Sequence, residues 1–211
     1  MSKKRNIIRP SSPKRPLGKS VLILVEGKKT EMNVIPNYVV KAAYPHLSIN
    51  YGNYNGGGYI DIQNWITRHS ASLDIVLVIC DLDRAESGQN EQDTLCSVIH
   101  FLEKNNIKNN IFLTYPAFED WLLHGLPFTQ FRELYQCLGY QNIRSQKADK
   151  NLWVHFIKKG GTWETSKTWF KSKPLFYEKK DFQVGKINKD YISQPQSSLY
   201  YFDEYLKLLN E

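Results

Sequence analysis

Hydrophobic residues in this chain fall into two alternating patterns. Short and often β-branched apolar runs are typical of strands buried on both faces of a sheet, and they occur in residues 20–26, 74–81 and 110–115. Residues 47–51, LSINY, are predicted to form a further strand. Between and after them, apolar residues recur at helical spacing in residues 36–44, 59–71, about 90–105 and 116–128. Pro36 and Pro116 suit the first turn of the first and last of these helices. This alternation predicts an α/β fold with a mainly parallel, doubly wound sheet covered by helices.

The sequence divides into three parts. Residues 1–19 combine prolines and serines with basic residues and predict a flexible basic arm, and residues 20–126 form the α/β domain. Residues 127–211 predict a helical extension rich in lysine and aromatic residues. Helical spacing recurs there in four segments: FTQFRELYQCLGY, DKNLWVHFIKK, TWETSKTWF and SSLYYFDEYLKLL.

The formal net charge of +7 over 211 residues is unevenly distributed. Residues 1–19 carry seven positive charges and no negative one, residues 20–140 have 8 basic and 13 acidic side chains, and residues 141–190 have 12 and 5. An acidic α/β half followed by a basic segment suits a metal site beside a phosphate-binding surface, although a solvated lysine-rich face explains the basic segment equally well.

Composition also bears on the cellular location that we expect for the protein. No apolar stretch approaches the roughly 18 residues of a membrane span, and the three cysteines form no C-x-x-C pair. The basic N-terminus has no apolar signal-peptide core behind it. We therefore expect a cytoplasmic protein without membrane contact.

The stretch VLVICDLDRAE places Asp81 and Asp83 at the exit of a buried strand. Ligand sites of parallel sheets lie at the carboxyl ends of strands, and the two side chains share a face if Leu82 stays extended. At roughly 4 to 5 Å, two such charges repel by about 3 to 4 kcal/mol. A cation, a basic side chain, a shared proton or solvation must offset that repulsion.

The first strand ends in Glu26, followed by GKKTE. A phosphate loop requires a glycine where this chain has Leu22, so a nucleotide-binding loop is not favoured. If the first and third strands are neighbours, Glu26 lies within several ångströms of Asp81 and Asp83. The alternative is that Glu26 is an exposed turn residue.

Four motifs in this order resemble those of the RloB-like proteins, a branch of the Toprim domains found in topoisomerases, bacterial primases and OLD-type nucleases. They are LILVEGKKTEMNVIPNYV, GGGYIDIQNWI, VICDLDRAE and TYPAFEDWLLHGLPF, in which Tyr115 replaces a usual asparagine. Together they span about residues 21–128.

The resemblance implies a Toprim-like fold and a Mg²⁺- or Mn²⁺-dependent nuclease. Glu26 would be the general acid/base or a metal ligand, Asp81 and Asp83 would hold the cation, and Glu119 would be a further acidic ligand. Glu31 would contact the residues that hold the metal rather than the metal itself. Hard oxygen ligands at a sheet edge agree with such an ion. The resemblance also implies a role in bacterial antiphage defence, nucleic acid as a partner, and an ATPase encoded nearby.

Other residues are weaker candidates. Gly57, within Asn55–Gly58, could present backbone N–H groups to a phosphate, or the segment is a plain turn. Lys150, with Lys147 nearby, is similar to a late lysine of the family and would stabilise charge on the phosphate, or forms a surface salt bridge. The tryptophans and lysines of the extension could stack on bases, or belong to the core: Trp153, Trp163, Trp169, Lys158, Lys159, Lys167, Lys171 and Lys173.

Three other functions compete with a nuclease. A haloacid-dehalogenase-type phosphatase expects a different continuation from Arg84 and Ala85, and a D-x-D glycosyltransferase needs a sugar-nucleotide domain for which the chain is short. The serious alternative is a Toprim-like module that binds nucleic acid or a partner protein without catalysis.

Overall fold

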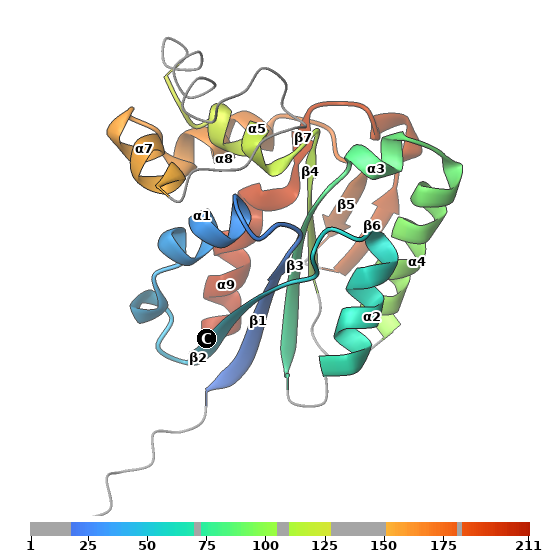
Figure 1. Ribbon diagram of the computed structural model, residues 1–211, viewed down its shortest axis with the longest axis horizontal. Helices are drawn as coiled ribbons and strands as arrows, with labels where there is room; N and C mark the ends of the chain where they lie inside the picture. Colours follow the sequence, from blue (N-terminus) through green and yellow to red (C-terminus); the bar gives the residue numbers. More distant parts are fainter. Residues whose placement is uncertain (1–17, 70–72, 105–109, 128–150, 181–182) are drawn as a thin grey trace, which may run out of the picture.

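The fold is a five-stranded sheet in the order β2-β1-β3-β4-β7, flanked by helices (Figure 1). The computed structural model describes residues 18–69, 73–104, 110–127, 151–180 and 183–211. The first four strands are parallel, and β7 pairs antiparallel with β4. The strands are β1 (Lys19–Val25), β2 (Leu47–Asn53), β3 (Ile75–Asp81), β4 (Asn110–Tyr115) and β7 (Gln196–Ser197), and a separate antiparallel pair is β5 (Tyr177–Lys180) with β6 (Gln183–Ile187). The expected α/β class with a mainly parallel sheet is confirmed.

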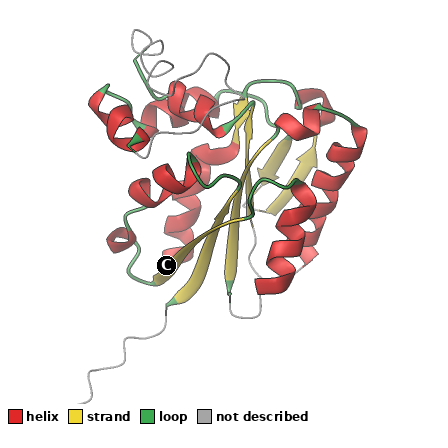
Figure 2. Ribbon diagram, viewed as in Figure 1, coloured by secondary structure: helices red, strands yellow, loops and turns green. Residues whose placement is uncertain are grey.

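Helices cover both faces of the sheet (Figures 1 and 2). One face carries α1, α5, α7, α8 and α9, and the other carries α2, α3, α4 and the β5–β6 pair. The helices are α1 (Glu31–Tyr38), α2 (Tyr59–His69), α3 (Asp83–Glu86), α4 (Gln89–Lys104), α5 (Phe118–Leu123), α7 (Leu152–Lys158), α8 (Trp163–Lys171) and α9 (Phe202–Asn210).

Side chains of the central strands alternate between the two faces. In β3, Leu77 and Ile79 belong to the core beneath α1 and α9, whereas Val78 and Cys80 belong to the core beneath α2 and α4. The same period of two makes Asp81 point to the α1 and α5 side. The strand pattern therefore decides which helices a side chain at the end of β3 can meet.

The C-terminal part of the chain is not only helical. Besides α7, α8 and α9 it contains β5, β6 and β7, and β7 extends the main sheet. Phe202 of α9 packs edge-on against Phe112 of β4 with ring centroids 5.0 Å apart. Lys19 Nζ donates to the carbonyl oxygen of Leu209 at 2.9 Å, so the last helix is fastened to the first strand. Three of the four helical segments expected beyond residue 126 correspond to α7, α8 and α9, but the expected helical extension missed β5, β6 and β7, because periodicity does not reveal short strands that pair over long distances.

Two helix boundaries also differ from the expectations. The helix expected to open at Pro36 begins at Glu31, because Val34 and Ile35 bury their side chains fully against the core. Pro116 precedes α5, which begins at Phe118. The arm before residue 18 and the helix expected in residues 128–140 lie outside the described residues.

None of the described helices combines the length and the apolar character that a membrane span requires.

Candidate metal centre at the carboxyl edge of the sheet

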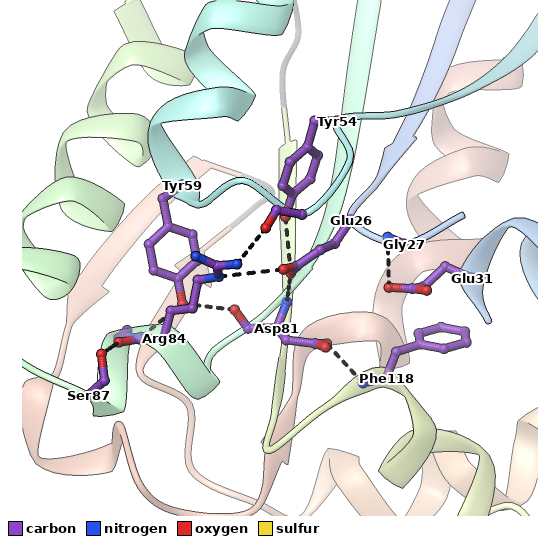
Figure 3. Close-up of polar contacts among 11 residues, drawn as sticks. Glu26, Gly27, Glu31, Tyr54, Tyr59, Asp81, Arg84, Ser87 and Phe118 are labelled. Carbon is purple, nitrogen blue, oxygen red and sulfur yellow. Dashed lines mark hydrogen bonds and ion pairs between the residues drawn. The ribbon is translucent and has the colours of Figure 1, made fainter. Parts of the chain in front are cut away.

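Glu26 follows β1 directly and points toward α2 and α3 (Figure 3). Its Oε2 accepts hydrogen bonds from the Tyr54 hydroxyl at 3.1 Å and from the backbone N–H of Asp81 at 3.4 Å. Its Oε1 lies 3.7 Å from Arg84 Nε. Burial raises the pKa of Glu26, as does the charge of Asp83, whereas the hydrogen bonds from Asp81 and Tyr54 and the charge of Arg84 oppose that rise. The Glu26 carboxyl group is therefore fixed by its contacts, and it keeps its proton more readily than the carboxyl group of an exposed glutamate.

Asp81, the last residue of β3, is tied to α5. Its Oδ1 accepts a hydrogen bond from the backbone N–H of Phe118 at 2.8 Å (Figure 3). Burial raises the pKa of Asp81 well above its usual value, and the neighbouring charges of Glu31, Glu26, Glu119 and Asp83 add to the shift in that order. The charges of four other carboxylates therefore act on Asp81.

Asp83 does not continue the strand. Leu82, with φ −93° and ψ −3°, is already helical, and Asp83 is the first residue of α3. The condition for Asp81 and Asp83 to share a strand face is not met, because Leu82 buries its side chain in the core and turns the chain. The Asp83 charge still raises the pKa values of both Glu26 and Asp81.

Glu31 and Glu119 come from α1 and α5 on the other side of the pocket. Glu31 is buried, and its Oε1 accepts from the backbone N–H of Gly27 at 3.2 Å. Burial, followed by the charge of Glu119, raises the pKa of Glu31 to about 8. Glu119 Oε1 accepts from the Thr30 hydroxyl at 2.5 Å, which joins the start of α1 to α5 across 89 residues of sequence.

An open pocket of about 500 Å³ is lined by three of these carboxylates, those of Glu26, Glu31 and Glu119, whereas Asp81 and Asp83 are not among its lining residues. Lys28 and Lys29 are exposed on its lining, so positive charge stands at the rim of an acidic interior. The pocket is lined by Glu26, Gly27, Lys28, Lys29, Thr30, Glu31, Asn55, Gly56 and Glu119. Such a mixture can attract a phosphate while leaving carboxylates near it.

The structure does not support a phosphate-binding role for Gly57, and it does not describe the candidate lysines. Gly57 is not among the pocket-lining residues, and a Cβ there would lie 1.6 Å from Asp61 Oδ2, so the glycine is needed for close approach of an acidic side chain. An adjacent carboxylate opposes a phosphate at Gly57. Lys147 and Lys150 lie outside the described residues, and their roles stay predictions.

Aromatic side chains of the extension are packed against other rings. Trp163 is buried and stacks on Tyr38 with centroids 3.8 Å apart. Trp169 stacks on His124 at 3.5 Å. Trp163 therefore belongs to the core, which is the second of the two alternatives given for the tryptophans of the extension.

Several polar residues around the site were not identified from the sequence. Thr30, Tyr54 and Tyr59 supply hydroxyl groups, and Arg84 supplies a cation. Thr30 and Arg84 stand inside the EGKKTE and DLDRAE motifs, so their positions offered a signal. The sequence around Tyr54 and Tyr59 contained no such signal, because their roles depend on contacts with Glu26 and with β3.

The donor set suits a hard divalent cation, but the ligands are not preassembled. Carboxylate oxygens are the ligands that Mg²⁺ and Mn²⁺ prefer, and the raised pKa values reflect a burial and mutual repulsion that a cation would offset. Within the part of the chain that the structure describes, no group of three or more His, Cys, Asp or Glu side chains is arranged to hold a metal directly. Binding would therefore need side-chain movement or ligand water, which Mg²⁺ commonly retains.

No family model matches the chain, and no curated protein or solved structure is significantly similar to it. The functional class is consequently inferred from the carboxylate cluster, the pocket and the sequence motifs.

Proposed function

We propose that the protein is a Mg²⁺- or Mn²⁺-dependent nuclease of RloB-like, Toprim type that hydrolyses phosphodiester bonds in DNA or RNA, with tRNA among the candidate substrates. One observation carries the proposal. Carboxylates following the adjacent parallel strands β1 and β3 act on one another and on those of α1 and α5, beside a pocket with two lysines on its lining. Carboxyl ends of parallel strands are the usual place for ligands in α/β sheets.

Each residue then has a distinct role. Asp81, Asp83 and Glu119 would hold the cation, which when bound polarises a phosphate and lowers the pKa of a coordinated water. Glu26 would transfer a proton at the reacting oxygen, a role that suits a carboxyl group whose pKa burial raises. Tyr54 and the Asp81 N–H orient Glu26 by bonding Oε2.

Basic residues would guide the nucleic acid. Lys28 and Lys29 can attract its backbone to the pocket, and the seven positive charges of residues 1–19 add nonspecific attraction. Lys150, if it reaches the site, would stabilise charge that develops on the phosphate. A partner ATPase, a role in antiphage defence and a cytoplasmic location rest on the family resemblance alone.

A binding module without catalysis is the second candidate. It is favoured by the way protein donors already occupy the carboxylates: Arg84 and Tyr54 on Glu26, and Thr30 on Glu119. Such a protein would bind nucleic acid or a partner protein at the same surface, and metal would not change the covalent state of the ligand.

Nuclease assays with matched variants separate the two functions. Purified protein is incubated with duplex DNA, single-stranded DNA, RNA and tRNA in Mg²⁺, Mn²⁺ or EDTA. We expect metal-dependent cleavage that Glu26→Gln reduces by at least about 100-fold while leaving binding affinity nearly unchanged. Glu91→Gln, on α4 outside the pocket lining, is the control and should cleave normally. Absence of cleavage in all mixtures, including those with a partner ATPase, would replace the nuclease with the binding module.

A further inference from the structure

Arg84 contacts two walls of the pocket at once. Its Nη2 donates to the carbonyl oxygen of Gly56 at 2.5 Å, while its Nε lies 3.7 Å from Glu26 Oε1 (Figure 3). Glu26 comes from the end of β1, and Gly56 comes from the turn between β2 and α2. Both residues line the pocket, so one guanidinium group joins two segments that are 30 residues apart in the sequence.

The turn that Arg84 holds has an unusual backbone. Asn55, Gly56 and Gly58 have φ values of 65°, 66° and 118°, in the region that disfavours most side chains. A Cβ on Gly58 would lie 3.4 Å from Arg84 Nη1, so the guanidinium also packs closely against this turn. Within the described residues, this turn has one further hydrogen bond besides that from Arg84 to Gly56: the Asp61 N–H donates to the Gly58 carbonyl oxygen at 3.1 Å. The conformation of this pocket wall consequently depends on Arg84.

Arg84 projects from a fixed base. Leu82 and Ala85, on either side of Arg84, are fully buried. The Tyr59 hydroxyl donates to the Asp81 carbonyl at 2.9 Å and accepts from the Ala85 N–H at 3.1 Å, which fastens α3 to both β3 and α2 (Figure 3). Because the backbone of Arg84 cannot shift easily, its guanidinium group can hold the groups that it contacts in fixed positions.

We propose that Arg84 is a positioning residue of the pocket: its guanidinium fixes the orientation of the Glu26 carboxylate and the conformation of the Asn55–Gly58 turn together. For its effect on catalysis, this inference rests on the proposed nuclease function. Arginine suits the task because its planar fork presents several donors in fixed directions. Lysine offers a single nitrogen on a flexible stem and can satisfy one of the two partners well, but not both.

The first test measures the metal-free protein and needs no catalytic activity. Amide hydrogen exchange is compared for wild type, Arg84→Lys and Arg84→Met, with Arg68→Lys and Arg68→Met as matched controls from the exposed C-terminal turn of α2. Exchange in residues 55–58 should become about tenfold faster in both Arg84 variants, while amides of β1 and β3 stay protected. Unchanged exchange in residues 55–58 would overturn the proposal.

The second test measures kcat and KM separately, so that an effect on turnover can be distinguished from an effect on substrate binding. Displacement of Glu26 should lower kcat by about 10- to 100-fold in Arg84→Lys, with the KM for nucleic acid within about twofold of wild type. The concentration of Mn²⁺ for half-maximal activity should not rise, since Arg84→Lys keeps the positive charge beside the carboxylates and removes no metal ligand. A raised KM with unchanged kcat would show that Arg84 binds the substrate itself, and would overturn the positioning role.

Chemical rescue distinguishes positioning from a loss of folding. Guanidinium chloride at low millimolar concentration should restore part of the turnover of Arg84→Ala and slow its exchange in residues 55–58, whereas ammonium should not. Lack of rescue in both measurements would count against the guanidinium contacts. If no nucleic acid is cleaved by wild type, the proposed function fails, while the exchange rates still decide the role of Arg84.

Discussion

The backbone N–H of Phe118 donates a hydrogen bond to Asp81 Oδ1 at 2.8 Å, which joins the end of β3 to the first turn of α5. Glu119 is the next residue of that helix. Asp81 therefore combines two properties that ordinary substitutions can separate: it accepts a bond that places α5, and it contributes negative charge to the carboxylate cluster.

Asp81→Asn should keep the bond and remove the charge, whereas Asp81→Ala should remove both. Because burial and its neighbours raise the pKa of Asp81, its ionisation costs stability as pH rises, and asparagine avoids that cost. In EDTA at pH 8 we expect Asp81→Asn to unfold at or above the wild-type temperature. Asp81→Ala should lose about 1 to 3 kcal/mol, since the Phe118 N–H loses its acceptor.

Mn²⁺ completes this comparison. It should raise the unfolding temperature of wild type and leave both Asp81 variants unaffected, because a ligand stabilises only the state that binds it. Thermal scans with and without Mn²⁺ provide the measurement. Equal shifts in all three proteins would place the metal, if one binds, away from Asp81.

Lys167 should be important for stability rather than for binding nucleic acid. Its Nζ lies 2.9 Å from Asp203 Oδ2 and also contacts Glu164 at 3.7 Å and Glu204 at 3.5 Å. Asp203 is buried, and among the residues that the structure describes its Oδ1 has no hydrogen-bond partner. Lys167→Met would leave this buried carboxylate without its cation and should reduce the free energy of unfolding by about 3 kcal/mol.

Urea unfolding of Lys167→Met, Asp203→Asn, their double variant and Lys171→Met checks the Lys167 prediction. Lys171→Met removes an exposed lysine one turn later on α8 and should change stability by less than about 0.5 kcal/mol. Asp203→Asn combined with Lys167→Met should recover much of the loss, because the buried charge is gone. Additive effects of the two substitutions would mean that Lys167 and Asp203 are not coupled.

His124 should make the protein less stable in mild acid. Its ring stacks on Trp169 at 3.5 Å and 9°, and burial, followed by the charge of Lys173, lowers its pKa to about 4. Between pH 6.5 and 4 the unfolded chain binds a proton at His124 that the folded protein does not. The stabilisation is therefore present above pH 6.5 and lost as pH falls toward 4.

The matched variant for this prediction is His124→Gln, which cannot titrate. Its free energy of unfolding relative to wild type should improve by about 1 kcal/mol between pH 7 and pH 5, a figure reduced because His124 is only half-buried. Urea titrations at both pH values measure the change. Parallel pH profiles would show that His124 is protonated equally in both states.

Local sequence patterns were sufficient for the main strands and for part of the site. The apolar run of β4 was predicted at residues 110–115 and occurs there, β1 begins and ends one residue earlier than predicted, and β3 begins one residue later. These strands are covered on both faces, so their composition alone identifies them. Glu26 and Asp81 could be placed at the same edge because β1 and β3 are adjacent and parallel.

The remainder depended on contacts that no local pattern contains. The direction of the Asp83 side chain depends on the helical backbone conformation of one residue, Leu82. Thr30 reaches Glu119 across 89 residues, and Arg84 reaches Gly56 across 28. The two residues of β7 show no strand periodicity of their own, and they pair because α8, α9 and β4 bring them together.

The fastening of α9 to β1 has a consequence for biosynthesis. Phe202, Leu206 and Leu209 help cover the face of the sheet to which Val21, Ile23 and Leu77 contribute. A nascent chain that has emerged only as far as β4 has four strands that can pair, but one of their faces lacks its final helix. At about 5 to 20 residues per second, the ribosome needs roughly 5 to 20 s to add the part of the chain beyond β4. During that interval the apolar face is open to chaperones and to other nascent chains, so expression at lower rates or with added chaperones should decide how much protein reaches the folded state.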